Sequence, residues 1–332
     1  MFTLSETVLV WVGFNLFVLF MLALDLGVFH RKAHDVSIKE ASLWSVAWIS
    51  LAMIFNVVLY FWRGSEIALQ FFTGYLIEKS LSVDNIFVFV LLFTYFSVPP
   101  LYQHRVLFYG ILGALVMRGV MIAAGAALIK EFHWIIYLFG AFLIVTGVRM
   151  ALHRNEAIHP EQNPVVKLVR RVIPVTPEYH GQRFFVRQAG VLMATPLFLT
   201  LVLIEFTDLV FAVDSIPAIF AVTQDPFIVY TSNVFAILGL RSLYFVLRGA
   251  VDKFYYLKLS LAAVLTFVGV KMVITDLYKI PIVLSLAVIV TFLGLGIIAS
   301  FLRARRLATD PNQQELPGVS DPAPIPGGGV ND

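Results

Sequence analysis

Five carboxylates in apolar surroundings are the side chains of this sequence best placed to do chemistry. They stand in two segments, LIEKSLSVDNIF with Glu78 and Asp84, and IEFTDLVFAVDSIP with Glu205, Asp208 and Asp214. A charged side chain at the centre of a lipid bilayer costs about 3 kcal/mol even on a lenient insertion scale. Acids in such places therefore need either a compensating charge or a function.

The available ligand atoms favour a hard cation. Carboxylate oxygens, with the amide of Asn85 and freed backbone carbonyls, suit Mg²⁺, Ca²⁺ and Mn²⁺, whereas zinc and copper sites prefer imidazole or sulfur. The chain has no cysteine, and its seven histidines fall in loops or at the ends of apolar segments. We therefore expect a divalent cation held by oxygen, and thiol redox chemistry within this chain is excluded.

Basic residues share these apolar segments, so a purely structural role of the acids in salt bridges stays open. Six acids stand against four bases there, which leaves two negative charges, enough for one divalent cation or two protons. A buried carboxyl can also keep its proton, and Asp25 lies close enough to the inner face to be solvated. The candidate metal ligands are Asp25, Glu78, Asp84, Asn85, Glu205, Asp208 and Asp214, and the candidate charge partners are Lys79, Arg118, Arg241 and Lys271.

The composition places these residues in a polytopic membrane protein. Of the 332 residues, 59% are hydrophobic and 14% are charged, against about 25% charged in soluble proteins, and the mean hydropathy is +0.87. No basic n-region or cleavage site marks the first apolar run as a signal peptide, so we expect it to stay as an anchor. With about 20 apolar residues per crossing, the predicted fold is all-α with nine spans, at residues 6–29, 40–62, 67–98, 105–129, 133–152, 190–222, 227–248, 256–276 and 281–302.

The basic residues also predict the topology. Most lysines and arginines fall in alternate connections between the spans, above all in the loop 153–189. The positive-inside rule then predicts an N-terminus outside and a C-terminus in the cytoplasm. Topology explains the net charge of +3, so no nucleic-acid partner is expected.

Two regions, 153–189 and 303–332, are predicted to lie outside the membrane portions 1–152 and 190–302. In the first, the segment NPVVKLVRRVIPV could form a short basic helix on the anionic inner leaflet. A solvated linker with a surface helix is the interpretation that such charge runs favour. The second region is rich in proline, glycine and polar residues, which predicts a disordered cytoplasmic tail.

The two acidic segments predict an inverted internal repeat. Glu78 and Asp84 are six residues apart, as are Asp208 and Asp214, and each pair is followed by a span in which Ile-Leu-Gly precedes an arginine. In the predicted topology the first segment runs inward and the second runs outward. Inverted repeats of this kind are typical of secondary transporters, whose sites lie near the midplane between the halves.

Helix geometry limits which acids can share one ion. Glu205 and Asp208 are three residues apart and share a face, but six residues at about 100° each turn Asp214 about 120° away from Asp208. Pro217 offers a solution, because it has no N–H and disturbs the turn that contains Asp214. We therefore expect a break in this helix, as in the discontinuous helices of transporters.

The sequence shows no site chemistry of an enzyme. Asp84 and Asp214 lack the Gly-x-Gly-Asp context of an intramembrane aspartyl protease, and no nucleotide loop, Ser/His/Asp set or haem-type histidine pair is visible. Lys271 is better explained as a buried counter-charge than as a Schiff-base lysine. We expect neither an enzyme nor a permanently bound cofactor.

Three motifs resemble a known family. ALDLGVFHRKAH, EKSLSVDNIF and EFTDLVFAVDSIPAIFAVT are similar to the TerC family of integral membrane proteins, and the likeness covers about residues 8–302. The resemblance implies a place in the LysE-type transporter superfamily, the bacterial inner membrane and, for one branch, export of Mn²⁺. The family is also linked to tellurium resistance and to a redox-modulator role. Its acidic positions map onto the six acids named above.

The sequence thus predicts an exporter of a divalent cation, Mn²⁺ above all, that works by alternating access and could be driven by proton return. Asn85 and Ser215 would assist the acids, while Arg118 and Arg241 would pair with whichever acids are empty. Two alternatives stay open: an assembly or stress-related membrane protein that moves no ion, and a carrier of an oxyanion such as tellurite, which the excess of acids disfavours. Membrane lipid and the metal ion are the expected partners, and the oligomeric state is left open.

Overall fold

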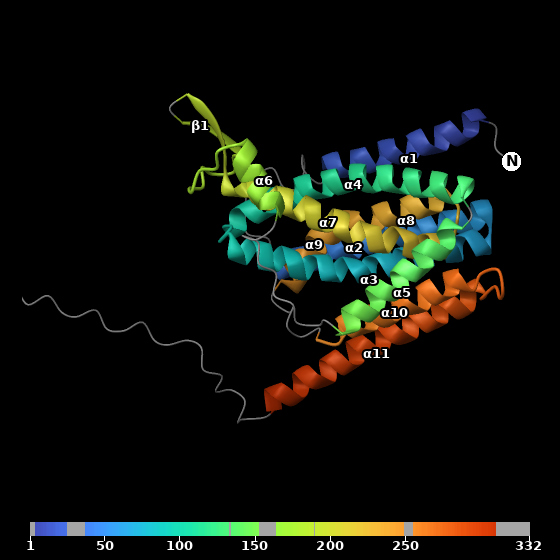
Figure 1. Ribbon diagram of the computed structural model, residues 1–332. Coiled ribbons are helices and arrows are strands. Elements are labelled where there is room, and N and C mark those ends of the chain that lie inside the picture. The colour runs from blue at the N-terminus through green and yellow to red at the C-terminus, as the bar shows by residue number, and fades with distance from the viewer. Residues whose placement is uncertain are drawn as a thin grey trace, which may run out of the picture.

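The computed structural model describes residues 4–24, 37–132, 134–152, 164–188, 190–248 and 255–309, and most of them are helical (Figure 1). Asp25 and residues 310–332 lie outside this described part of the chain. The predicted start of the disordered tail at residue 303 is wrong, because the last helix continues to Thr309. The elements are α1 (Leu4–Leu24), α2 (Ile38–Arg63), α3 (Ser65–Tyr95), α4 (Pro100–Glu131), α5 (Ile135–Leu152), α6 (Pro164–Val172), β1 (Phe185–Gln188), β2 (Val191–Ala194), α7 (Pro196–Phe220), α8 (Pro226–Leu238), α9 (Leu240–Leu247), α10 (Leu257–Val273) and α11 (Ile282–Thr309).

Local sequence explains where several helices begin and end. At the start of α2 the Ser37 hydroxyl accepts a hydrogen bond of 3.2 Å from the backbone N–H of Glu40, as N-cap serines do. Gly64, between α2 and α3, has a φ of 93°, which a residue with a Cβ rarely adopts. Asp225 caps α8 by accepting a 2.9 Å hydrogen bond from the N–H of Phe227. These residues mark where α2, α3 and α8 begin or end.

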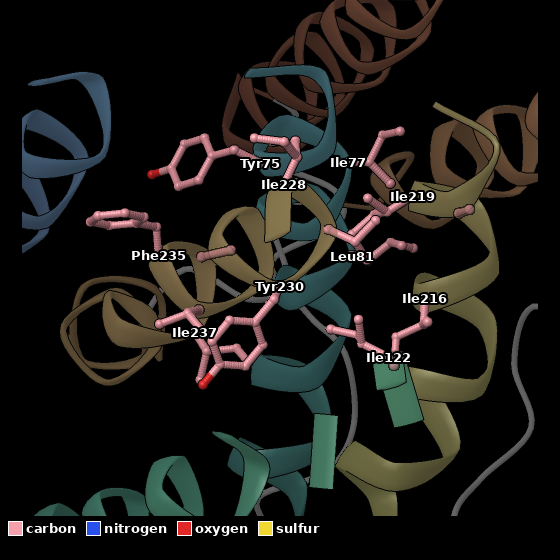
Figure 2. Packing of buried hydrophobic residues seen from close by; sticks show 14 of the residues in the cluster. Tyr75, Ile77, Leu81, Ile122, Ile216, Ile219, Ile228, Tyr230, Phe235 and Ile237 are labelled. Carbon is pink, nitrogen blue, oxygen red and sulfur yellow. The ribbon is translucent and has the colours of Figure 1, made fainter. Parts of the chain in front are cut away.

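The helices α2, α3, α4, α7 and α8 pack around an apolar core. Figure 2 shows branched side chains from α3, α4, α7 and α8 meeting there. Each of the following exposes 8% of its surface or less: Ile77, Leu81, Ile122, Ile216 and Ile237. Polar groups among these side chains are therefore held away from water and need partners inside the protein.

A second unit is formed by α5, α10 and α11, with α10 packed along both of the others. Figure 1 shows these three helices together on one side of the bundle, crossing it at a slant. Glycines let α5 and α10 approach closely: a Cβ built on Gly269 would lie 2.6 Å from the carbonyl oxygen of Gly140. Small residues serve this purpose at helix contacts in membranes. The unit meets the bundle far less extensively than α5 meets α10.

Each of the nine predicted spans contains a helix. Five described helices, α2, α4, α5, α7 and α11, are long and apolar enough to cross a membrane, and α8 with α9 makes a sixth candidate, bent by 41°. The polytopic class is supported, while nine crossings stay a prediction. The predicted start of the span 190–222 is wrong, because residues 191–194 form a strand and α7 begins at Pro196.

Contacts between helix ends agree with the predicted alternation of sides. Arg63 at the end of α2 forms a 2.7 Å ion pair with Asp225 before α8, and the Tyr179 hydroxyl donates a 2.6 Å hydrogen bond to the carbonyl of Phe96. Each contact joins two segments that the predicted topology places on the same side of the membrane. Which side faces the cytoplasm stays a prediction.

The loop between α5 and α7 folds into a small lobe. The predicted basic helix is present as α6, and β1 pairs with β2 in an antiparallel hairpin that the all-α prediction did not include. The Tyr179 hydroxyl holds the lobe to the end of α3, and burial raises the pKa of Tyr179 to about 12. The Thr195 hydroxyl donates a further 2.7 Å hydrogen bond to the carbonyl of Arg183.

Candidate functional site

A buried arginine is at the centre of the site. Arg118 on α4 exposes 2% of its surface. Its Nη2 donates to Oδ1 of Asp208 on α7 at 2.9 Å, and its Nε donates to Oδ2 of the same carboxylate at 3.2 Å. Nη1 forms an ion pair with Glu78 on α3. This fork-to-carboxylate geometry is the strong, directional form of an arginine ion pair.

Amides and a hydroxyl complete the surroundings of this arginine. Nη1 of Arg118 donates to Oδ1 of Asn233 on α8 at 2.8 Å and to Oγ of Ser215 at 3.4 Å. Nδ2 of Asn85 donates to Oδ1 of Asp208 at 3.1 Å. We call these six residues the Arg118 centre: Glu78, Asn85, Arg118, Asp208, Ser215 and Asn233. They come from four helices, and each exposes 3% or less.

The Arg118 centre holds more acceptors than donors. With both carboxylates ionised it carries two negative charges against one positive charge. Two oxygens of the centre, Oε2 of Glu78 and Oδ1 of Asn85, are buried with no hydrogen-bond partner among the described residues. A buried acceptor left without a donor costs about 1–3 kcal/mol. A cation or a proton would satisfy both the charge and the oxygens.

A small cavity adjoins the centre. It is lined by Asp208 and by Arg241 of α9, with apolar side chains around them, and its volume is about 10 Å³. That volume is close to the minimum that one water molecule needs. Arg241 lines the same cavity as Asp208, and its role as a charge partner stays a prediction.

The second acid of each pair points elsewhere. Asp84 on α3 interacts electrostatically with Lys258 of α10, and Asp214 on α7 makes a side-chain hydrogen bond with Thr146 of α5. The predicted break at Pro217 is wrong: α7 continues through it to Phe220. The proline lies in the last turn of α7, so only a few helical residues follow it and a break there would redirect little of the helix. The straight helix keeps Asp214 about a third of a turn away from Asp208.

The third acid of α7 lies against the backbone of α4. A Cβ built on Gly113 would overlap the carboxylate of Glu205. One buried oxygen of this carboxylate, Oε2, has no hydrogen-bond partner among the described residues. Glu205 is one helical turn from Asp208, so it lies beside the Arg118 centre without belonging to it.

The predicted single cluster of acids is therefore divided among several places. In the described ranges, no three histidines or acids gather closely enough to hold a metal ion. Glu78 and Asp208 meet at Arg118, whereas Asp84, Glu205 and Asp214 lie on other faces. Whether Asp25 contributes lies outside the described residues.

Of the predicted charge partners, Arg118 takes the central place. Lys79 turns the other way and donates a 3.2 Å hydrogen bond to the carbonyl of Ala236, next to the bend at Gly239 between α8 and α9. Lys271 lies on α10 outside the Arg118 centre. The broken helix expected at Pro217 is found instead at Gly239.

Sequence reasoning missed Asn233, the direct partner of Arg118. The available signal was a run of polar residues, TSN, inside an otherwise apolar segment. All three residues of this run are fully buried, and a polar residue in an apolar helix usually faces the interior of the bundle.

The fold and this site define a class: a multi-pass integral membrane protein with a buried ionic centre. The description "Integral membrane protein TerC family" matches residues 63–308, and the chain belongs to this family. An uncharacterized membrane protein of Myxococcus xanthus, STKORF319, is 58% identical over 299 residues, covering 90% of this chain and 94% of its own.

Two enterobacterial relatives are provisionally named membrane-bound redox modulator Alx. The Salmonella typhi protein is 52% identical over 289 residues, covering 84% of this chain and 90% of its own. The protein of Escherichia coli strain K12 is 51% identical over the same length and the same shares. No solved structure matches this chain.

Proposed function

We propose that the protein exports a hard divalent cation, Mn²⁺ above all, across the bacterial inner membrane by alternating access. The observation that carries this proposal is the pair of buried oxygens without donors, Oε2 of Glu78 and Oδ1 of Asn85, in a centre with surplus negative charge. Carboxylate and amide oxygens are ligands that Mn²⁺ accepts readily. The metal is substrate here, and no permanently bound cofactor is proposed.

In this mechanism the guanidinium of Arg118 occupies the place of the cation in the empty carrier. Its bonds to Glu78 and Asp208 pair two buried carboxylates with one positive charge, which leaves one negative charge in excess. An entering divalent cation competes for the same oxygens and displaces Arg118. Because carboxylates must be deprotonated to bind metal, protons can exchange for the ion.

The α5–α10–α11 unit provides the moving part. Asp84 and Asp214, the second acids of the two segments, each interact with a residue of this unit, Asp84 electrostatically with Lys258 and Asp214 by a hydrogen bond with Thr146. The first acids of both segments pair with Arg118. Equivalent acids thus have equivalent surroundings, which supports the inverted repeat. Acids at a limited contact surface can follow the ion when the unit shifts against the bundle.

Flux into proteoliposomes tests the proposal, with Mn²⁺, Ca²⁺, Mg²⁺ and Zn²⁺ compared with and without a pH gradient. We expect Mn²⁺ uptake by the wild-type protein and its loss in Asp208→Asn. Glu66→Gln is the matched control, since Glu66 is an exposed acid in the first turn of α3. Unchanged Mn²⁺ flux in Asp208→Asn would exclude the Arg118 centre as the ion path.

A redox or assembly role is the second candidate, because relatives carry the redox name. This chain contains no cysteine, so thiol exchange within it cannot be the reaction. If the buried charges serve only to hold helices together, exchanging the charges in Glu78→Arg with Arg118→Glu should restore function. Under the transport proposal the exchanged pair stays inactive, because the cation then meets an arginine on α3.

A further inference from the structure

The lobe between α5 and α7 carries an apolar surface that the Arg118 centre leaves unexplained. We call residues 164–188 and 190–194 the α6–hairpin lobe. Leu168 and Val172 on α6 are 61% and 69% exposed, and Val191 and Leu192 at the tip of the hairpin are 53% and 55% exposed. Large apolar side chains are costly to leave in water, so a contact surface is indicated.

Helix α6 shows how this surface is arranged. Val166 is buried, and Val165 and Val169 pack against the ends of the bundle helices. At about 100° per residue, Leu168 and Val172 continue this apolar face beyond the part that protein covers. The lysine and arginines of α6 occupy the opposite arc. The helix therefore presents an uncovered apolar edge beside a cationic face.

The charge of the lobe identifies what could cover this edge. The lobe contains five basic side chains, Lys167, Arg170, Arg171, Arg183 and Arg187, against one acid, Glu178. In the hairpin, Arg187 pairs across the strands with Leu192, so a cation and an exposed apolar side chain share one face. Apolar residues flanked by lysine and arginine suit the headgroup region of an anionic bilayer.

The lobe is also placed to reach lipid. Tyr179 and Thr195 hold it to the helix ends, and the rings of Phe185 and Phe198 lie 4.5 Å apart between β1 and α7. Figure 1 shows α6 and the hairpin at the end of the bundle where α11 also ends, with the hairpin leaning outward from the bundle. These contacts hold the apolar and cationic surface of the lobe over the lipid leaflet that surrounds the helices.

We infer that the α6–hairpin lobe binds the anionic leaflet of the membrane in which the protein lies. Leu168, Val172, Val191 and Leu192 enter the boundary between headgroups and acyl chains, and the arginines bind lipid phosphates. This contact is independent of the transported ion.

The chain has no cysteine, so a single nitroxide label can test the contact in the full-length protein. Leu192→Cys is labelled and reconstituted in nanodiscs of phosphatidylcholine, with or without phosphatidylglycerol, and its accessibility to a water-soluble nickel chelate is measured. We expect several-fold lower accessibility in the phosphatidylglycerol discs, reversed by high salt. Equal accessibility in both lipids overturns the inference.

Two matched variants sharpen the result. A label at Glu178→Cys, the exposed acid of the lobe, should stay accessible in both lipids. Arg170→Gln with Arg171→Gln in the Leu192→Cys protein should abolish the lipid difference while the size-exclusion profile stays unchanged. Protection of Leu192→Cys that appears in detergent and rises with protein concentration would assign the surface to a second copy of the chain, against the inference.

Discussion

At the scale of single residues, the proposed transport gives Arg118 the role of a built-in substitute for the cation. One guanidinium holds two carboxylates that come from α3 and α7. Removing one partner of a buried ion pair costs about 3–5 kcal/mol, since a charge is left uncompensated. The proposed transport therefore requires two states of the centre, one with Arg118 and one with an ion between the acids.

Arg118→Met tests this substitution directly. We expect a loss of about 3–5 kcal/mol in the free energy of unfolding, seen as a lower melting temperature in detergent. Added Mn²⁺ should raise the melting temperature of this variant more than that of wild type, because the ion finds the acids unoccupied. Arg149→Met on α5, whose side chain is exposed, serves as control. If Mn²⁺ raised the melting temperature of Arg118→Met and of wild type by the same amount, the result would contradict the role of Arg118.

Gly113→Ala probes the position of Glu205. The new Cβ would overlap the carboxylate, but the end of a glutamate side chain can swing aside, so we expect a loss of stability below about 1 kcal/mol. The carboxylate is then displaced from its place beside Asp208, and Mn²⁺ flux should fall toward that of Glu205→Gln. Gly13→Ala on α1, where a Cβ meets open space, is the control. Wild-type flux in Gly113→Ala would remove Glu205 from the ion path.

At the scale of elements, the contact of α5 with α10 depends on glycines. At Gly269 a Cβ would meet backbone, the carbonyl oxygen of Gly140, which cannot move as a side chain can. We expect Gly269→Ala to lower the free energy of unfolding by about 1–3 kcal/mol, the usual cost of overpacking. Gly294→Ala on α11, with nothing within 4 Å of a new Cβ, should gain stability through helix propensity. Thermal melts of Gly269→Ala and Gly294→Ala, each compared with wild type, measure these opposite changes in stability.

Pro217→Ala distinguishes a continuous α7 from a functional break. Because α7 passes straight through Pro217, replacing the proline restores an N–H for the carbonyl of Val213 and should raise stability by up to about 3 kcal/mol. Mn²⁺ flux should stay at the wild-type level. A folded variant that has lost flux would instead support a break at this position.

The sequence predicted most helices and the residues that carry buried charge, but not which acid pairs with which base. Apolar length determines a helix, and mid-membrane depth follows from counting residues, so Glu78 and Asp208 could be paired with Arg118 as a hypothesis. Which acids share a face depends on how each helix is rotated. The six-residue spacing indicated correctly that Asp214 turns away from Asp208. The prediction of a break at Pro217 contradicted this spacing, because it assumed that all the acids share one ion site.

The hairpin and Asn233 show two further limits. The prediction placed residues 191–194 at the start of an apolar span, because a strand of four residues is too short to show the alternation of apolar and polar side chains. Asn233 lies 115 residues from Arg118, so its polar run indicates a buried residue but does not identify its partner. Both depend on tertiary packing rather than on local pattern.

At the scale of the whole molecule, the acids form two classes related by the proposed repeat. Glu78 and Asp208 meet at the Arg118 centre, while Asp84 and Asp214 interact with Lys258 and Thr146 of the α5–α10–α11 unit. If the first class binds the ion and the second follows its movement, substitutions in the first class should weaken ion binding, and substitutions in the second class should reduce flux. Substitutions within one class should resemble each other, although the residues lie far apart in the chain.

Amide substitutions at these four acids test the division. Glu78→Gln and Asp208→Asn should weaken Mn²⁺ binding at least about tenfold, the effect of losing about 1.4 kcal/mol, and lower flux in proportion. Asp84→Asn and Asp214→Asn should keep Mn²⁺ affinity, measured by calorimetry in detergent, yet reduce flux in proteoliposomes. If Asp84→Asn retained flux while Asp214→Asn lost it, the two acids would not be equivalent, and neither the repeat nor the moving unit would explain the transport.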